Sequence, residues 1–228
     1  EMRHVTGVQT CALPILLIAF TFHEYAHALV AYKLGDDTPK HQGRLSLNPL
    51  VHIDIIGFLM LLFLDFGWAK PVETNPRAFK NYYKDDLKVS IAGVIGNLVA
   101  ALLASIILAG LIIINNKSDS MVIILNMVIC VIETNCLLVF LNLLPIPGFD
   151  GFHVLRDLFP KFFYEIEEKL YTYRYMILLV LLIPIPGLGS SIINFILDVP
   201  AEKLTDLFMK IAYAIRSEER RVGKECME

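Results

Sequence analysis

The chain has 228 residues, of which 56% are hydrophobic and 19% are charged, and its formal net charge at pH 7 is −3. Soluble domains are usually about 45–50% apolar, and the excess here is gathered in runs long enough to cross a bilayer, which favours a polytopic membrane protein. The sequence contains no basic patch with interleaved aromatic residues, so it lacks the signature of a nucleic-acid-binding protein.

Both ends of the chain resemble translated sequencing adaptors. The first reads VTGVQTCALPI at residues 5–15, and the second reads RSEERRVGKEC at residues 216–226. We therefore expect residues 1–15 and 216–228 to be non-native tails. Residues 16–215 are expected to form a single membrane-embedded domain.

The predicted elements begin with a helix over residues 16–34, which ends at Gly35 as helices commonly do. A polar segment rich in turn residues follows. Within it, the alternation of residue types at 44–47 predicts a short β-hairpin. The apolar run at 55–66 is too short to span a bilayer and predicts a re-entrant or buried helix.

The second half of the domain contains the clearest membrane spans, at residues 89–115 and 121–144. A turn rich in proline and glycine follows at 145–151. The apolar stretch at 175–197 is broken by prolines and glycines, so it predicts either one span or a bent hairpin. The expected fold class is all-α, with about four to six transmembrane or re-entrant helices.

Basic residues in the loops predict the orientation in the membrane. Lysine and arginine are frequent between residues 33 and 88, whereas the link between the two clear spans contains only Lys117. If the run at 55–66 does not cross, the first helix ends in the cytoplasm. Asp150 then lies on the same side of the membrane.

The sequence His23-Glu24-Tyr25-Ala26-His27 fits the pattern H-E-x-x-H. Residues four apart share one face of a helix, so both imidazoles can bind one metal ion, and the glutamate can take a proton from a metal-bound water. Ionisable residues in an apolar helix need such a partner. The alternative is a polar contact between helices in a transporter or bundle.

Two histidines leave a catalytic zinc site one protein ligand short. Candidates for the third ligand are His41, His52, Asp54, Glu73, Glu133, Asp150 and His153. Glu133 lies within a span, where it either binds the metal or makes a hydrogen bond between helices. Asp150 lies in a turn whose prolines forbid a regular helix, so its carboxylate can point inward. An aspartate that only stabilises the turn explains the pattern almost as well.

Four segments, in chain order, resemble the site-2 protease family of intramembrane zinc metalloproteases. They are HEYAH, GRLSLNPLVHID, AGVIGN and NLLPIPGFDG. The resemblance extends over residues 20–158 and is greatest to the compact bacterial type without a PDZ or nucleotide-sensing domain. The chain departs from the family pattern at Val94, Gly148 and Phe149, which are not ligand positions.

The resemblance implies a role for each residue of the site. His23, His27 and Asp150 would bind one zinc ion per chain, and Glu24 would be the general base. Asn142, which opens the last motif, would help to position the substrate or the oxyanion.

The predicted function is therefore hydrolysis of a peptide bond in or near the transmembrane segment of a membrane protein, with a single-span protein as substrate. The short strand at 44–47 would either offer an edge on which the unwound substrate could pair or serve only as a structural hairpin. The protein is expected in the bacterial plasma membrane, with its site toward the cytoplasm; the sequence predicts no oligomeric state.

Two other classes of function stay open. A metal transporter would need further acidic or histidine residues along other spans, and only Glu133 is found there. An inactive homologue acting as a scaffold would be expected to have lost a ligand or the base, yet all four residues are present.

Overall fold

The computed structural model describes the backbone of residues 2–64, 67–114, 118–183 and 191–225, with side chains for 14–60, 67–114, 118–183 and 191–217. In chain order its elements are α1 (Met2–Lys33), α2 (Thr38–His41), η1 (Pro49–His52), α3 (Ile55–Leu64), η2 (Pro76–Ala78), α4 (Tyr82–Ile114), α5 (Asp119–Asn142), α6 (Asp150–Leu158), α7 (Pro160–Leu182) and α8 (Ile192–Glu225). The helical backbone includes residues 2–15 and 216–225, and their interpretation as tails stays a prediction.

Three helices in the described part of the chain are long and apolar enough to cross a membrane. They are Pro14–Lys33 within α1, Tyr82–Ile114 and Asp119–Asn142. The all-α polytopic class is thereby confirmed. α3 has ten residues, which amounts to about 15 Å of helix and is too short to span. The predicted break in the stretch 175–197 falls on residues 184–190, which lie outside the described residues.

α4 begins at Tyr82 rather than at residue 89, because polar side chains at its start support the first turns. The Asp85 carboxylate accepts the backbone N–H of Asn81 at 2.9 Å and pairs with Lys88 at 2.7 Å. The helix can therefore extend beyond the apolar run into the charged segment that precedes it.

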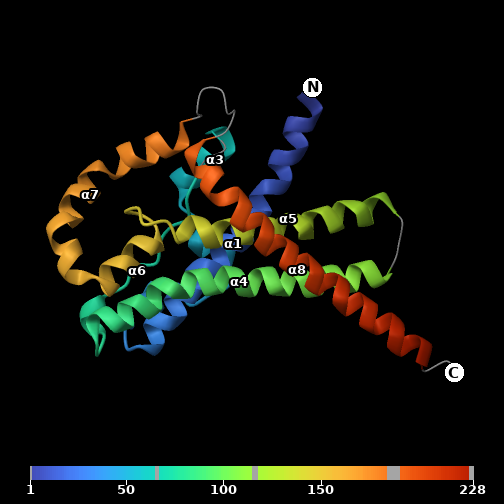
Figure 1. Cartoon of the computed structure of the whole chain (residues 1–228), viewed down its shortest axis with the longest axis horizontal. Coiled ribbons are helices and arrows are strands. Elements are labelled where there is room, and N and C mark those ends of the chain that lie inside the picture. The colour runs from blue at the N-terminus through green and yellow to red at the C-terminus, as the bar shows by residue number, and fades with distance from the viewer. Residues whose placement is uncertain (1, 65–66, 115–117, 184–190, 226–228) are drawn as a thin grey trace.

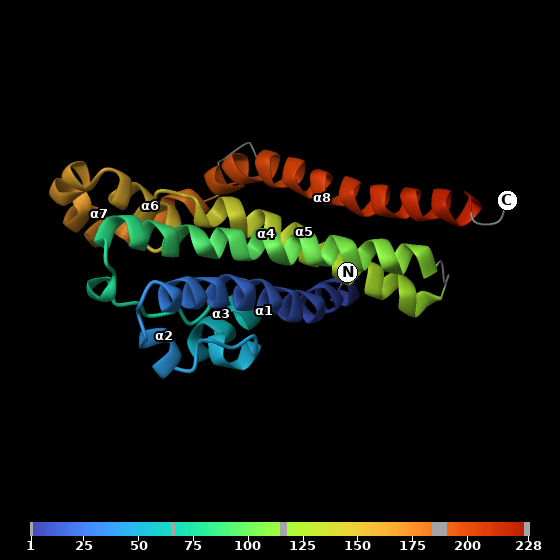
Figure 2. The ribbon, with the colours of Figure 1, turned by 90° about the horizontal axis from the view of Figure 1, so that it is seen from below.

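α4 is the central helix of the bundle, in contact with α1, α5, α6 and α8. Figure 2 shows three layers, with α1, α2 and α3 on one side, α4 and α5 in the middle, and α8 across the other side. The core between α4, α5 and α8 uses small residues such as Ala101, Ala104, Cys136 and Ala212. Small side chains let helices approach closely in a membrane. α7 bows away from this bundle (Figure 1).

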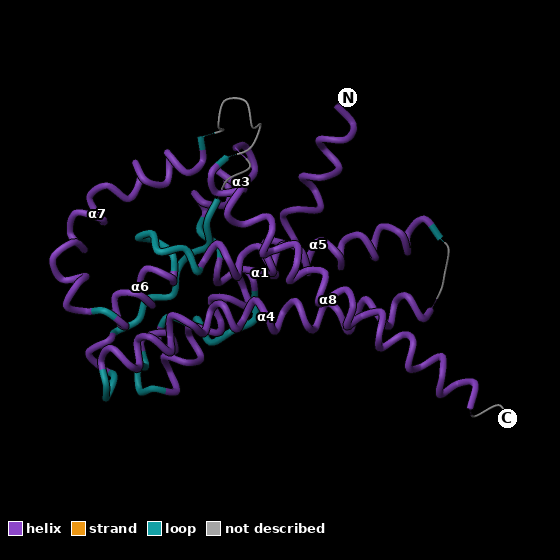
Figure 3. The backbone as a smooth tube through the Cα atoms, in the orientation of Figure 1, coloured by secondary structure: helices purple, strands orange, loops and turns teal. Residues whose placement is uncertain are grey.

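The short β-hairpin predicted after the first helix is wrong. Residues 44–47 form no strand, and the described part of the chain consists of helices and loops (Figure 3), with isolated bridges such as the one between Ile53 and Ala69. The buried Arg44 guanidinium instead donates to the carbonyl oxygens of Val51 at 2.6 Å and Lys70 at 3.2 Å. The Arg44 side chain therefore satisfies carbonyl oxygens of two neighbouring loop segments, and residues 44–47 offer no strand edge to a substrate.

An ionic cluster connects α6 to α4. Arg156 Nη2 pairs with the Asp86 carboxylate of α4 and, at 2.9 Å, with Asp157 Oδ1 on its own helix. The Asp157 side chain is fully buried, and its Oδ2 has no hydrogen-bond partner. Two carboxylates thus share one guanidinium.

The stability of the folded protein is expected to depend on pH through this cluster. Burial raises the pKa of Asp157 to about 6, against the opposing effect of Arg156. Because the pKa of an unfolded aspartate is about 3.9, the folded state holds the proton more tightly. The free energy of unfolding should therefore fall as pH rises from about 4 to 6.

We expect Asp157→Asn to abolish the decrease in the free energy of unfolding between about pH 4 and pH 6. The free energy of unfolding of the variant should exceed that of the wild type by roughly 1–3 kcal/mol at pH 7 and by little at pH 4. Thermal unfolding of the detergent-purified protein at both pH values measures the difference. A difference that is the same at both pH values would contradict the prediction.

Candidate metal centre

Three of the side chains considered as metal ligands lie together. His23 and His27 are one helical turn apart on α1, and Asp150 is the first residue of α6. The two Nε2 atoms are 3.0 Å apart, and Asp150 Oδ2 lies 3.4 Å from His23 Nε2 and 3.3 Å from His27 Nε2. Two atoms that each bind zinc at about 2.0 Å in tetrahedral geometry lie about 3.3 Å apart. The spacing therefore fits a single ion.

The second nitrogen of each imidazole determines the tautomer. His27 Nδ1 lies 2.7 Å from the carbonyl oxygen of Val89, which can only accept, so Nδ1 carries the proton. His23 Nδ1 lies 2.8 Å from Asn97 Oδ1. The Asn97 amide nitrogen donates to the carbonyl oxygen of Ala19 at 3.2 Å, which assigns Oδ1 as the acceptor. When the imidazoles are neutral, both rings therefore present an unprotonated Nε2, which is the metal-binding form.

This arrangement calls for a cation. With both imidazoles neutral and no cation bound, two nitrogen lone pairs would face each other at 3.0 Å, and the buried Asp150 Oδ2 has no hydrogen-bond partner. Buried polar groups that stay unsatisfied cost free energy, and charged ones cost more. One divalent cation satisfies all three atoms, so the residues fit zinc.

Glu24 follows His23 on α1 and is only 8% exposed. Its Oε2 accepts a 2.8 Å hydrogen bond from the backbone N–H of Val72, in the irregular segment before η2. Among the described residues, the group able to hold a metal contains both histidines and Asp150 but not Glu24. A carboxylate next to the ligands, and not one of them, is free to exchange a proton with a water.

Residues 53–185 match the family described as Peptidase family M50. The "Putative zinc metalloprotease YwhC" of Bacillus subtilis (strain 168) is 36% identical over 202 residues, which cover 86% of this chain and 90% of that protein. The chain belongs to Peptidase family M50. It is thus a metalloprotease of the site-2 protease family, an integral membrane protein with zinc as its cofactor. No solved structure matches the chain.

The M50 match includes Asp150 but begins after the two histidines. The assignment of His23 and His27 as ligands in this protease therefore rests on the geometry of the cluster, to which α1 contributes both rings.

Two asparagines support His23 in a way that the sequence did not reveal. Asn97 of α4 and Asn135 of α5 are both 0% exposed. Asn97 Nδ2 donates to Asn135 Oδ1 at 2.9 Å, and Asn135 Nδ2 donates to the carbonyl oxygen of Val131 at 2.8 Å. Every donor in this chain of bonds has an acceptor, so the network connects α1, α4 and α5 and orients the ring. The available signal was a pair of polar residues in apolar spans, which is costly without a function.

Gly93 is the residue of α4 that lies against the two candidate histidine ligands of this M50 protease. A Cβ added there would lie 2.5 Å from His23 Cε1 and closer still to His27 Nε2. We expect Gly93→Ala to displace one ring and lower the zinc content of the purified protein well below that of the wild type. Gly110→Ala on the same helix meets nothing within 4 Å and is the matched control. Equal zinc in both variants would contradict this expectation.

The other candidate ligands lie elsewhere. His41, Glu73 and Glu133 are exposed. Asp54 Oδ1 accepts the backbone N–H of Gly57 at 2.8 Å, which is the turn role that its position favoured. His52 is buried and donates from Nε2 to the carbonyl oxygen of Ser46 at 2.8 Å.

His153 is half-buried and its ring packs against Phe152. A metal transporter would need further ligand groups along the spans, and the described residues contain one such group.

Asn142 is the last residue of α5 and is half-buried. It lies at the start of the turn that leads to Asp150, so both residues belong to the same short connection between α5 and α6. Its role in positioning the substrate stays a prediction.

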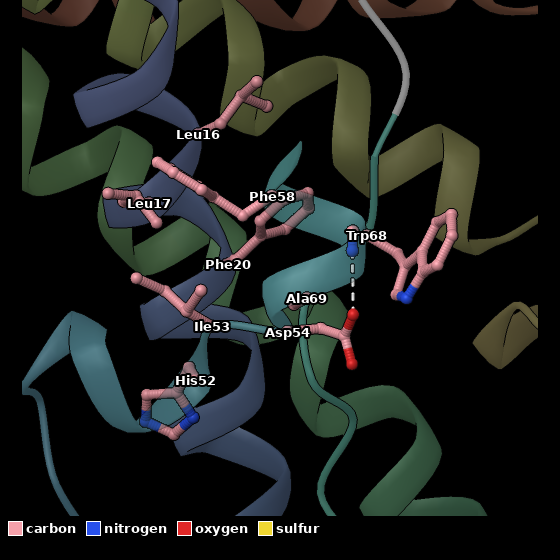
Figure 4. A pocket seen from close by; sticks show the side chains of 10 residues that line it. Leu16, Leu17, Phe20, His52, Ile53, Asp54, Phe58, Trp68 and Ala69 are labelled. Carbon is pink, nitrogen blue, oxygen red and sulfur yellow. Dashed lines mark hydrogen bonds between the residues drawn. The ribbon is translucent and has the colours of Figure 1, made fainter. Parts of the chain in front are cut away.

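A small apolar pocket lies between α1, α3 and the segment at Trp68 (Figure 4). Leu16, Leu17 and Phe20 line it from α1, and Phe58 lines it from α3. The three candidate ligands and Glu24 do not line this pocket. The metal centre is therefore identified by its side-chain geometry and not by a cavity.

Proposed function

We propose that this protease hydrolyses a peptide bond in or near the transmembrane segment of a membrane protein, with one zinc ion per chain held by His23, His27 and Asp150 and with Glu24 as general base. The observation that carries the proposal is the meeting of the two Nε2 atoms with an Asp150 oxygen that has no other hydrogen-bond partner. The M50 membership supports the reaction class.

Zinc, when bound, supplies a Lewis acid that polarises the scissile carbonyl and lowers the pKa of a water. Glu24 takes the proton from the attacking water and passes it to the leaving amine. The hydrogen bond from the Val72 N–H orients the Glu24 carboxylate through Oε2. Asn142, at the end of α5, is proposed to position the substrate beside this group.

The substrate class follows from where the site lies. His23 and Glu24 lie within the membrane span of α1 and are 7% and 8% exposed. A peptide bond reaches such a site only from within or beside the bilayer, and its helix must unwind because helical carbonyls are hydrogen-bonded. We therefore propose a single-span membrane protein as the substrate. The loop charges and the bacterial relative support a plasma-membrane location with the site toward the cytoplasm.

The proposal is tested by the metal content of the detergent-purified protein. We expect about one zinc per chain, removable by a chelator and restored by added zinc. A folded protein that holds no zinc and regains none would sink the proposal.

A further inference from the structure

One face of α4 supports each of the three proposed metal ligands. The carbonyl oxygen of Val89 accepts from His27, and the side chain of Asn97 accepts from His23. One turn before Val89, the Asp86 carboxylate pairs with Arg156 of α6, the helix that begins with Asp150. Residues 86, 89, 93 and 97 recur at three- and four-residue spacing, so they lie on one side of α4.

α6 needs such support because it is short and lacks a capping side chain. It has nine residues, and its N-cap residue Phe149 makes no side-chain cap hydrogen bond. Gly151 in the first turn lies so close to the backbone of Leu143 that a side chain would not fit there. The first turn is therefore held by packing against the end of α5, whereas the last turn carries Arg156.

Burial makes the ion pair between α4 and α6 a strong orienting contact. The side chains of Asp86 and Arg156 are 9% and 16% exposed. A buried pair of this kind adds little net stability, but a buried charge without its partner is costly, so alternative placements of α6 are disfavoured. Arg156 lies about 9 Å along the helix axis from Asp150, and a change of tilt at one end moves the other.

We propose that the Asp86–Arg156 ion pair is a positioning device that holds the Asp150 carboxylate against His23 and His27. The pair contacts neither metal nor substrate and acts through α6. This inference rests on the proposed function, because it takes Asp150 to be a ligand.

Apolar packing offers the competing explanation. Phe152 is fully buried, and its ring packs against Phe163 and Tyr171 of α7 at centroid distances of 5.3 and 5.2 Å. If this packing alone places α6, loss of the ion pair changes stability and leaves metal binding unaltered. The experiment must therefore measure affinity for the metal as well as folding.

The test is the zinc Kd of the detergent-purified protein by competition with a chelator, together with the visible spectrum of the cobalt-substituted protein and the unfolding temperature. We expect Asp86→Asn and Arg156→Gln to weaken zinc binding about 10–100-fold, as the loss of an outer partner of a ligand does, and to alter the cobalt spectrum. The double variant Asp86→Arg/Arg156→Asp restores the pair with its charges exchanged and should recover most of the affinity.

Asp157→Asn is the matched control, because Asp157 contacts the same guanidinium without connecting α6 to α4. It should bind zinc as the wild type does. Wild-type affinity and spectrum in Asp86→Asn would overturn the inference, even if that variant unfolds at a lower temperature. If Asp86→Asn does not fold, a folded double variant with weak zinc binding would overturn it equally.

A wrong assignment of the metal ligands can be distinguished from a wrong assignment of the positioning role. A wild type that binds no zinc, or an Asp150→Ala variant that binds it with unchanged Kd, rejects the proposed ligand set. If Asp150→Ala weakens binding and Asp86→Asn does not, only the positioning role is wrong.

Discussion

Glu24→Gln is expected to keep the zinc and lose most of the peptide-bond hydrolysis. Glutamine has the same shape, and its amide oxygen can still accept the N–H of Val72, which lies 2.8 Å from Glu24 Oε2. It cannot take a proton from water at neutral pH. General acid–base catalysis contributes about 10²–10⁴ to a rate, so we expect a loss of that size.

The measurement compares wild type and Glu24→Gln in liposomes that contain a panel of single-span membrane proteins, with zinc content determined on the same samples. Glu133→Gln is the matched control, since it makes the same chemical change at an exposed position on α5. Cleavage by Glu24→Gln at the wild-type rate would remove Glu24 from the mechanism. Loss of zinc together with activity would make Glu24 a ligand or a structural residue.

The spacing of the HEYAH residues was sufficient to predict the geometry of α1 at the site. A helix repeats every 3.6 residues, so His23 and His27 share a face wherever that helix lies, and the structure places their Nε2 atoms 3.0 Å apart. Long apolar runs were sufficient to predict the spans, because a helix buried in lipid requires them. Both are local properties of the sequence.

The identity of the third candidate ligand depended on contacts between distant segments, which cannot be read from a single sequence. From the sequence, Glu133 and Asp150 were both plausible third ligands. In the structure Glu133 is exposed on α5, whereas Asp150 at the start of α6 lies beside the two histidines. The pair of Asp86 and Arg156 could not be foreseen either, since the two residues are far apart in the chain and ordinary for a loop border. The β-hairpin prediction rested only on the alternation of residue types at 44–47, and it failed because the Arg44 guanidinium is buried against loop carbonyls in a segment that forms no strand.

Asp150→Ala is expected to lower the zinc affinity by more than the roughly 10–100-fold that an outer partner costs, because it removes a proposed ligand outright. The two Nε2 atoms would remain 3.0 Å apart on α1 with no anionic oxygen beside them. Asp37→Ala removes an exposed aspartate whose side chain makes no capping hydrogen bond, and it serves as the matched control. The measurement is the zinc Kd by chelator competition on folded protein.

Retention of full zinc affinity by Asp150→Ala would leave the histidines as metal-binding residues and reject the proposed third ligand. Glu24 would then be the next carboxylate to test, because it lies beside His23 on α1 and is buried. A clear loss in Asp150→Ala with wild-type binding in Asp37→Ala would instead establish that the turn after α5 completes the site. Helix α6 would then contribute to metal binding through its first residue, and the way α6 packs on α4 would determine how tightly the protease holds its zinc.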